Sequence, residues 1–243
     1  MKLKVRLLKN KGFLFTINKR YKPLKTIVPI GCDCHPAYML KTLNLREQSL
    51  PFDWLDTKPK YGLKYVYENI NNSFIFFLTD LKKNDENKVF SNKFNYSTFY
   101  HFDDLVTNDE LKLKIKKRIK LFLSIIKNKP IYFINTVTSE SLNNVESVKF
   151  YYKSVQAYLN VLKKDDELII YLRYDENFEE NNFFCEDLIK KVNGIGNKVK
   201  IIKYLREMKK FGIWGDEKKY KPLIKNMGIK LYPTFPKIKI TKI

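Results

Sequence analysis

The residues best suited to chemistry gather near position 34. Cys32, Cys34 and His35 follow a short apolar run, and Pro36 comes directly after them. Proline is well tolerated in the first turn of a helix, so the pattern predicts a strand, a turn at Gly31 and then a helix. Unpaired amides and the helix dipole at such a start lower the pKa of a nearby thiol. Cys34 is therefore the candidate nucleophile.

A thiol nucleophile also needs a base and a group that orients the base. The chain has only two histidines, His35 and His101, so a histidine-based mechanism must use one of them. His101 is the distant candidate for general base and then acid, and Asp103 or Asp104 could orient it; we choose Asp103. The first helix amides after Cys34 would stabilise the oxyanion.

The same residues have simpler interpretations. Cys34 could be an inert thiol at a strand end, because buried cysteine often behaves as a small hydrophobe. Cys185 lies at helical spacing with apolar residues and is predicted to be core. Cys32, Cys34 and His35 do not have the C-x-x-C spacing that zinc sites favour, and a fourth ligand is missing. We therefore expect no metal and no cofactor.

Two blocks of sequence resemble a known family. Residues 30–40 read IGCDCHPAYML, and residues 45–54 read LREQSLPFDW. They resemble the bacterial and viral family of papain-like cysteine peptidases, whose pattern is S-L-G-x-x-C-x-x-A-x-x-L followed by L-R-x-x-S-x-P-F-D-W. That pattern continues into an aromatic segment with a histidine followed by an acid, which residues 100–103 match. Pro29 stands where the family has its first serine.

The resemblance implies a thiol hydrolase or acyl transferase in which Cys34 precedes His101. It places Arg46, Asp53 and Trp54 in the second block, and we expect these three to contact the substrate, a peptide or a glycan. It also implies a papain-like α+β fold as an alternative architecture.

Two other function classes remain open. The resemblance points to surface-polysaccharide assembly, so a glycosyltransferase-like enzyme could use the same crevice without a thiol intermediate. A non-enzymatic polyanion-binding protein would instead use the basic ends of the chain and would not need Cys34.

Strand and helix patterns alternate along the middle of the chain. Buried strands are predicted at 27–30, 131–135, 168–172 and 199–202, with helices between them. Thr107 and Glu110 have capping-box spacing and predict the start of one of these helices. Such alternation is typical of an α/β fold, a mostly parallel sheet with helices on both faces. Ligands bind beyond the carboxyl ends of such strands, where the turn with Cys32 and Cys34 would lie.

Composition limits the remaining possibilities. The 243 residues include 44% hydrophobic residues, enough for a packed core, and we expect a single domain over 1–243. Three cysteines are too few for a secreted disulfide scaffold. The chain has no apolar run long enough to be a transmembrane segment, so we expect a cytoplasmic protein.

The charge is strongly basic. Lys and Arg number 47 against 26 acids, a net charge of +21, and 41 of the 47 are lysine. A possible basic arm (1–25) and a possible basic tail (218–243) could contact an anionic partner. The first of these could also form a strand pair around residues 5–17. A solvated surface with lysine-rich composition is the alternative.

Overall fold

The computed structural model describes residues 2–8 and 11–242, which divide into two compact units. One unit spans 25–228, and the other combines 1–24 with 229–243. The second unit is a three-stranded antiparallel sheet of order β1-β2-β11. Its strands are β1 (Lys2–Leu8), β2 (Lys11–Pro23) and β11 (Leu231–Lys242). The predicted strand pair is therefore present, and the tail supplies the third strand.

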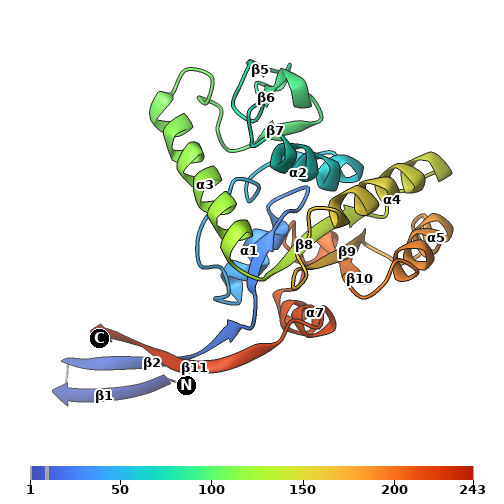
Figure 1. Cartoon of the computed structure of the whole chain (residues 1–243). Coiled ribbons are helices and arrows are strands. Elements are labelled where there is room, and N and C mark those ends of the chain that lie inside the picture. Colours follow the sequence, from blue (N-terminus) through green and yellow to red (C-terminus); the bar gives the residue numbers. More distant parts are fainter. Residues whose placement is uncertain (1, 9–10, 243) are drawn as a thin grey trace. The chain divides into compact units, whose positions relative to one another are not determined.

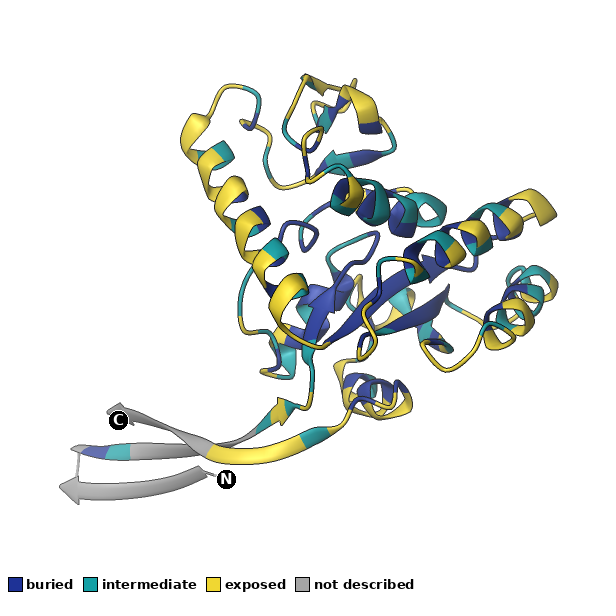
Figure 2. Ribbon diagram, in the orientation of Figure 1, coloured by how far each residue is buried: buried dark blue, intermediate teal, exposed yellow. Residues whose placement is uncertain are grey.

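A four-stranded parallel sheet forms the centre of the 25–228 unit, in the order β10-β9-β8-β3 (Figure 1). Its strands are β3 (Thr26–Pro29), β8 (Ile131–Thr138), β9 (Glu167–Asp175) and β10 (Val199–Arg206). All four coincide with predicted strands. Every residue of β8 is buried, as expected for a parallel strand covered on both faces (Figure 2).

Helices connect these strands, because parallel neighbours need a crossover. The helices are α1 (His35–Thr42), α2 (Gly62–Asn71), α3 (Asp109–Asn128), α4 (Val145–Leu159), α5 (Asn182–Asn193), α6 (Met208–Phe211) and α7 (Tyr220–Asn226). Short 3-10 turns are η1 (Pro59–Tyr61), η2 (Asn92–Phe94) and η3 (Glu217–Lys219). α2, α4 and α5 lie side by side (Figure 1).

Side chains alternate across the sheet, so both faces need cover. On β9, Ile170 and Leu172 belong to the main core, while Tyr171 between them points to the opposite face. There it meets His35 of α1, which in turn contacts Tyr220 of α7. The predicted α/β fold with helices on both faces of a parallel sheet is thus confirmed.

A small antiparallel sheet lies between α1 and α3 in the sequence and was not predicted. Its order is β4-β7-β6-β5. The strands are β4 (Asp56–Thr57), β5 (Leu81–Lys83), β6 (Val89–Ser91) and β7 (Ser97–Phe99). They are too short to give a period-2 pattern that sequence can detect. Because this sheet makes the chain a mixture of parallel and antiparallel parts, the papain-like α+β description also fits.

One predicted helix start was wrong by a residue. Asn108, not Thr107, caps α3, and its side chain accepts a hydrogen bond from the Leu111 amide at 3.0 Å. Asparagine is a better N-cap residue than threonine, which agrees with the helix beginning after Asn108.

Candidate active site

Cys34 lies where the sequence placed it, at the start of α1 beyond the carboxyl end of β3. The turn before it is tight: a Cβ added at Gly31 would stand 2.7 Å from Cγ of Pro36. Of the three cysteines, Cys32 and Cys185 are buried, whereas Cys34 is only half-buried. Cys34 is therefore the cysteine that a substrate can reach.

Asp33 holds the start of α1 beside Cys34. Its Oδ1 accepts a hydrogen bond from the His35 amide at 3.0 Å, and its Oδ2 accepts one from Arg173 at 2.5 Å. Arg173, on β9, also pairs with Asp175 at 3.4 Å. Arg206 of β10 donates two hydrogen bonds to Asp175, at 2.6 and 2.7 Å. Four alternating charges thus run along the carboxyl ends of β9 and β10 to the cysteine turn.

This environment disfavours the Cys34 thiolate. Burial, and then the negative charge of Asp33, raise the pKa of Cys34 to about 11. Burial would raise the pKa of Asp33 too, but Arg173 and His35 outweigh it and keep that pKa below its usual value. The sequence led us to expect a lowered thiol pKa from the helix start, and that expectation was wrong because burial of the thiol, and then the charge of Asp33, outweigh the effect of the helix start.

The predicted oxyanion site at the start of α1 is also partly occupied. The His35 amide donates to Asp33, and Pro36 has no amide hydrogen. The first two positions of the helix therefore offer no free donor to a developing oxyanion. A donor must come from elsewhere around Cys34.

His35 has a structural role that the sequence did not reveal. Its Nδ1 lies 2.9 Å from the Tyr171 hydroxyl and its Nε2 lies 3.2 Å from the Trp214 carbonyl oxygen. Because a carbonyl only accepts, Nε2 donates to it and Nδ1 accepts from Tyr171. Burial lowers the pKa of His35 to about 4, so the ring is neutral. It packs between the rings of Tyr204 and Tyr220, each with its centroid 5.6 Å away.

The second predicted block forms a linked cluster. Arg46 donates to Oδ2 of Asp53 at 2.5 Å, and the Leu50 amide donates to the same oxygen at 2.7 Å. The Arg46 guanidinium lies 5.3 Å from the centre of the Trp54 ring. Burial outweighs Arg46 and raises the pKa of Asp53. Asp53 is almost fully buried, so its contacts show it holding its own loop.

His101 joins this cluster rather than the cysteine turn. Its ring lies edge-on to Trp54, with centroids 5.6 Å apart. Asp103 pairs with Lys88 at 3.1 Å. No contact in the described part of the chain links His101 to Cys34 or to Asp103, so the pairing of these three residues stays a prediction.

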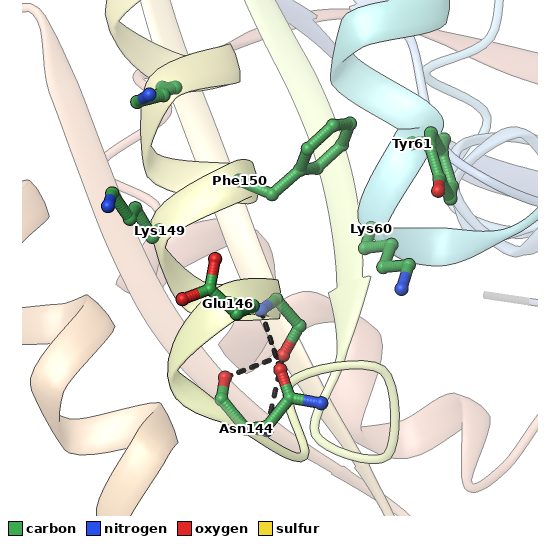
Figure 3. Close-up of a pocket in the computed structure, with 8 residues that line it drawn as sticks. Lys60, Tyr61, Asn144, Glu146, Lys149 and Phe150 are labelled. Carbon is green, nitrogen blue, oxygen red and sulfur yellow. Dashed lines mark hydrogen bonds between the residues drawn. The ribbon is translucent and has the colours of Figure 1, made fainter.

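A groove adjoins the cysteine turn. The Thr57 amide donates to the Cys32 carbonyl at 2.7 Å, and a Cβ at Gly62 would lie 3.4 Å from the Cβ of Cys32. The segment between these two contacts forms one wall of a cavity of about 370 Å³, and α4 forms the other (Figure 3). Phe150 projects from α4 across this gap toward Tyr61 (Figure 3). The lining residues are Lys60, Tyr61, Asn144, Glu146, Ser147, Lys149, Phe150 and Lys153.

Arg173 and Arg206 were not among the predicted site residues, but the scarcity of arginine in the sequence could have pointed to them. The chain has six arginines, and the four in the 25–228 unit are Arg46, Arg118, Arg173 and Arg206. Three of them are bound to carboxylates in the two clusters above. Arginine is preferred for bidentate pairing, so its few positions in a lysine-rich chain mark places where geometry matters.

Comparisons with known proteins agree with the residues near Cys34. Searches of curated proteins and of solved structures found no match. No helix in the described ranges is both long and apolar enough to cross a membrane. A family model with the description "Putative papain-like cysteine peptidase (DUF1796)" matches residues 25–177, which include both sequence blocks and His101. The chain therefore belongs to this family.

Proposed function

We propose that the protein is a cysteine-dependent hydrolase or acyl transferase in which Cys34 is the nucleophile. The observation that carries this proposal is the position of Cys34, half-buried at the carboxyl edge of the parallel sheet and inside the range that the family model matches. Ligands of open α/β sheets bind at this edge.

The raised pKa of Cys34 defines what the mechanism requires. With a pKa of about 11 the resting thiol is protonated, so a base must remove its proton as Sγ attacks the acyl carbon. We assign this role to His101, which then returns the proton to the leaving amine or alcohol. Water or an acceptor hydroxyl next attacks the thioester and gives its proton to His101, which passes that proton to the departing Cys34 sulfur and so restores the thiol.

The proposal requires His101 to move toward Cys34, because the two side chains are not in contact in the described part of the structure. His101 is exposed, and its ring contacts the rings of Trp54 and Tyr100. Catalytic hydrogen bonds often tighten only when substrate is bound. Trp54 lies beside His101 and faces the same substrate, whereas Arg46 and Asp53 fix the loop that carries Trp54. Asp103 would orient His101 only by leaving Lys88.

Trapping of an acyl-enzyme tests the proposal. The protein is incubated with p-nitrophenyl acetate and with aminoacyl and glycan esters, and the mass of the intact chain is measured. We expect one acyl group on Cys34 in the wild type, none in Cys34→Ala, and normal acylation in the matched variant Cys185→Ala. Acylation that is unchanged in Cys34→Ala, or absent with every ester at pH 7 to 10, would overturn it. His101→Ala separates the base from the nucleophile, because it should slow acylation most at pH 7 and have a progressively smaller effect as the pH rises toward the Cys34 pKa of about 11.

A further inference from the structure

A short segment between β10 and α7 exposes apolar and basic side chains together. Residues 208–214 read MKKFGIW, without an acid, and we call them the tip segment. Phe211 is 40% exposed and Ile213 is 62% exposed. Lys209 and Lys210 are exposed as well. Single exposed apolar residues are ordinary, but neighbouring apolar and lysine side chains on one short segment are typical of interfacial segments.

Buried groups hold the tip segment in place. Arg206 donates to the Ile213 carbonyl at 3.0 Å. The Trp214 carbonyl accepts from His35 at 3.2 Å and from the Tyr220 hydroxyl at 2.5 Å. Arg206, His35 and Tyr220 are all buried, so hydrogen bonds from the core hold the backbone of the tip segment in position. The exposure of Ile213 is therefore built into the fold rather than produced by a loose loop.

The charges around the tip segment favour an anionic surface. Within the described residues neither the Lys209 nor the Lys210 ammonium has an ion-pair partner; Lys210 lies 5.0 Å from the centre of the Phe211 ring. The acids near the tip segment all have hydrogen-bond or ion-pair partners. Glu207 pairs with Lys219 at 2.5 Å, and Glu217 accepts from Tyr38 at 2.6 Å. Asp216 accepts from the Lys218 amide at 3.0 Å, and Glu176 accepts from the Lys209 amide at 2.8 Å.

An aromatic pair forms the base of the tip segment. Trp214 stacks on Tyr38 of α1, with ring centroids 3.9 Å apart. Tryptophan and tyrosine concentrate at membrane-water interfaces, where the ring is apolar and its polar atom stays hydrated. Trp214 is only half-buried and directly follows the exposed Ile213 in the sequence.

We propose that the tip segment docks on the surface of an anionic lipid membrane. Phe211 and Ile213 enter the interface, while Lys209 and Lys210 contact the lipid headgroups. This peripheral contact is independent of the chemistry at Cys34.

Vesicle sedimentation tests the proposal with the full chain. Vesicles of phosphatidylcholine alone are compared with vesicles that contain about 30% phosphatidylserine, at about 0.15 M salt. We expect binding only to the anionic vesicles. Ile213→Asp should weaken it by about tenfold, and reversing both lysines in Lys209→Glu/Lys210→Glu should weaken it by at least as much.

Phe183→Asp is the matched control. Phe183 is 78% exposed on α5, but Glu179, Glu180 and Glu186 lie near it in the sequence. The same apolar-to-acid change there should alter binding by less than twofold. No wild-type binding to anionic vesicles, or equal binding to neutral ones, would overturn the proposal. An equal loss of vesicle binding in Phe183→Asp would also overturn it. So would full binding by Ile213→Asp, because the contact would then belong to lysines elsewhere, such as those at the basic ends.

A second readout places the contact at the tip segment itself. The chain has two tryptophans, so Trp54→Phe leaves Trp214 as the only indole reporter. Its emission should shift to shorter wavelength on anionic vesicles, and the shift should disappear in Ile213→Asp. Binding without any shift would mean that another surface touches the lipid.

Discussion

Replacing Asp33 by Asn tests how the fold controls the proton on Cys34. Asparagine keeps a side-chain oxygen that can accept from the His35 amide, but it removes the negative charge beside the sulfur. Burial of Cys34 is unchanged. The pKa of Cys34 should therefore fall from about 11 toward the value that burial alone imposes.

The magnitude follows from the thiolate population. At pH 7.5 a thiol of pKa about 11 has about 300-fold less thiolate than a free thiol of pKa ~8.5. The more basic thiolate is the better nucleophile, which recovers about tenfold. Wild-type Cys34 should thus react with iodoacetamide about 30-fold more slowly than a free thiol. Each unit by which Asp33→Asn lowers the pKa raises thiolate ~tenfold and the net rate about threefold.

The assay is the rate of iodoacetamide labelling at Cys34 between pH 6 and 11, followed by mass spectrometry in a Cys32→Ala background. Asp175→Asn is the matched control, because it removes a negative charge from the same network without being among the causes of the Cys34 shift. We expect the wild-type rate to keep rising to about pH 11 and Asp33→Asn to level off earlier. A wild-type profile that levels near pH 8.5, or one that Asp33→Asn leaves unchanged, would refute this reasoning.

Three further predictions concern stability. Asp53→Ala should cost about 3 kcal/mol in urea unfolding, because it leaves Arg46 without its carboxylate in a nearly buried position; a cost under 1 kcal/mol would mean that solvent replaces the pair. Gly31→Ala should lower the melting temperature, since the new Cβ meets Pro36 at 2.7 Å; an unchanged melting temperature would show that the turn adapts. His35 has a folded-state pKa of about 4 against ~6.5 when unfolded, so the unfolded chain binds the extra proton between these values. Its neutral form contributes about 3 kcal/mol that is complete above pH 6.5 and lost as the pH falls to 4, and His35→Gln should remove that part of the pH dependence; an identical pH profile in the variant would contradict the shift.

The parallel sheet could be predicted because its strands are continuous apolar runs. Residues 131–135 and 168–172 have the composition of strands buried on both faces, and the helices between them carry apolar residues at helical spacing. The position of Cys34 at the start of a helix followed from Gly31 and Pro36 alone. These are local signals, and each depends on residues within about ten positions of one another.

The antiparallel pairing could not be predicted in the same way. β2 pairs with β11, which lies more than two hundred positions later in the sequence. Two strands so far apart in the sequence can pair only after the chain between them has folded and brought them together. The periodic pattern of a single sequence carries no signal for such a long-range contact. The small β4-β7-β6-β5 sheet was missed because its strands have two or three residues each.

The sequence by itself determined that this chain has an α/β core and that a cysteine lies at the start of a helix. It also showed the resemblance to a family of papain-like peptidases. Only the tertiary structure decided the chemical state of that cysteine. Arg173 and Trp214 lie far from Cys34 in the sequence, yet Arg173 fixes Asp33 beside the thiol and the Trp214 carbonyl accepts a hydrogen bond from the His35 ring next to it. A thiol pKa depends on charge and burial within a few ångströms in space, and sequence distance does not report either of them.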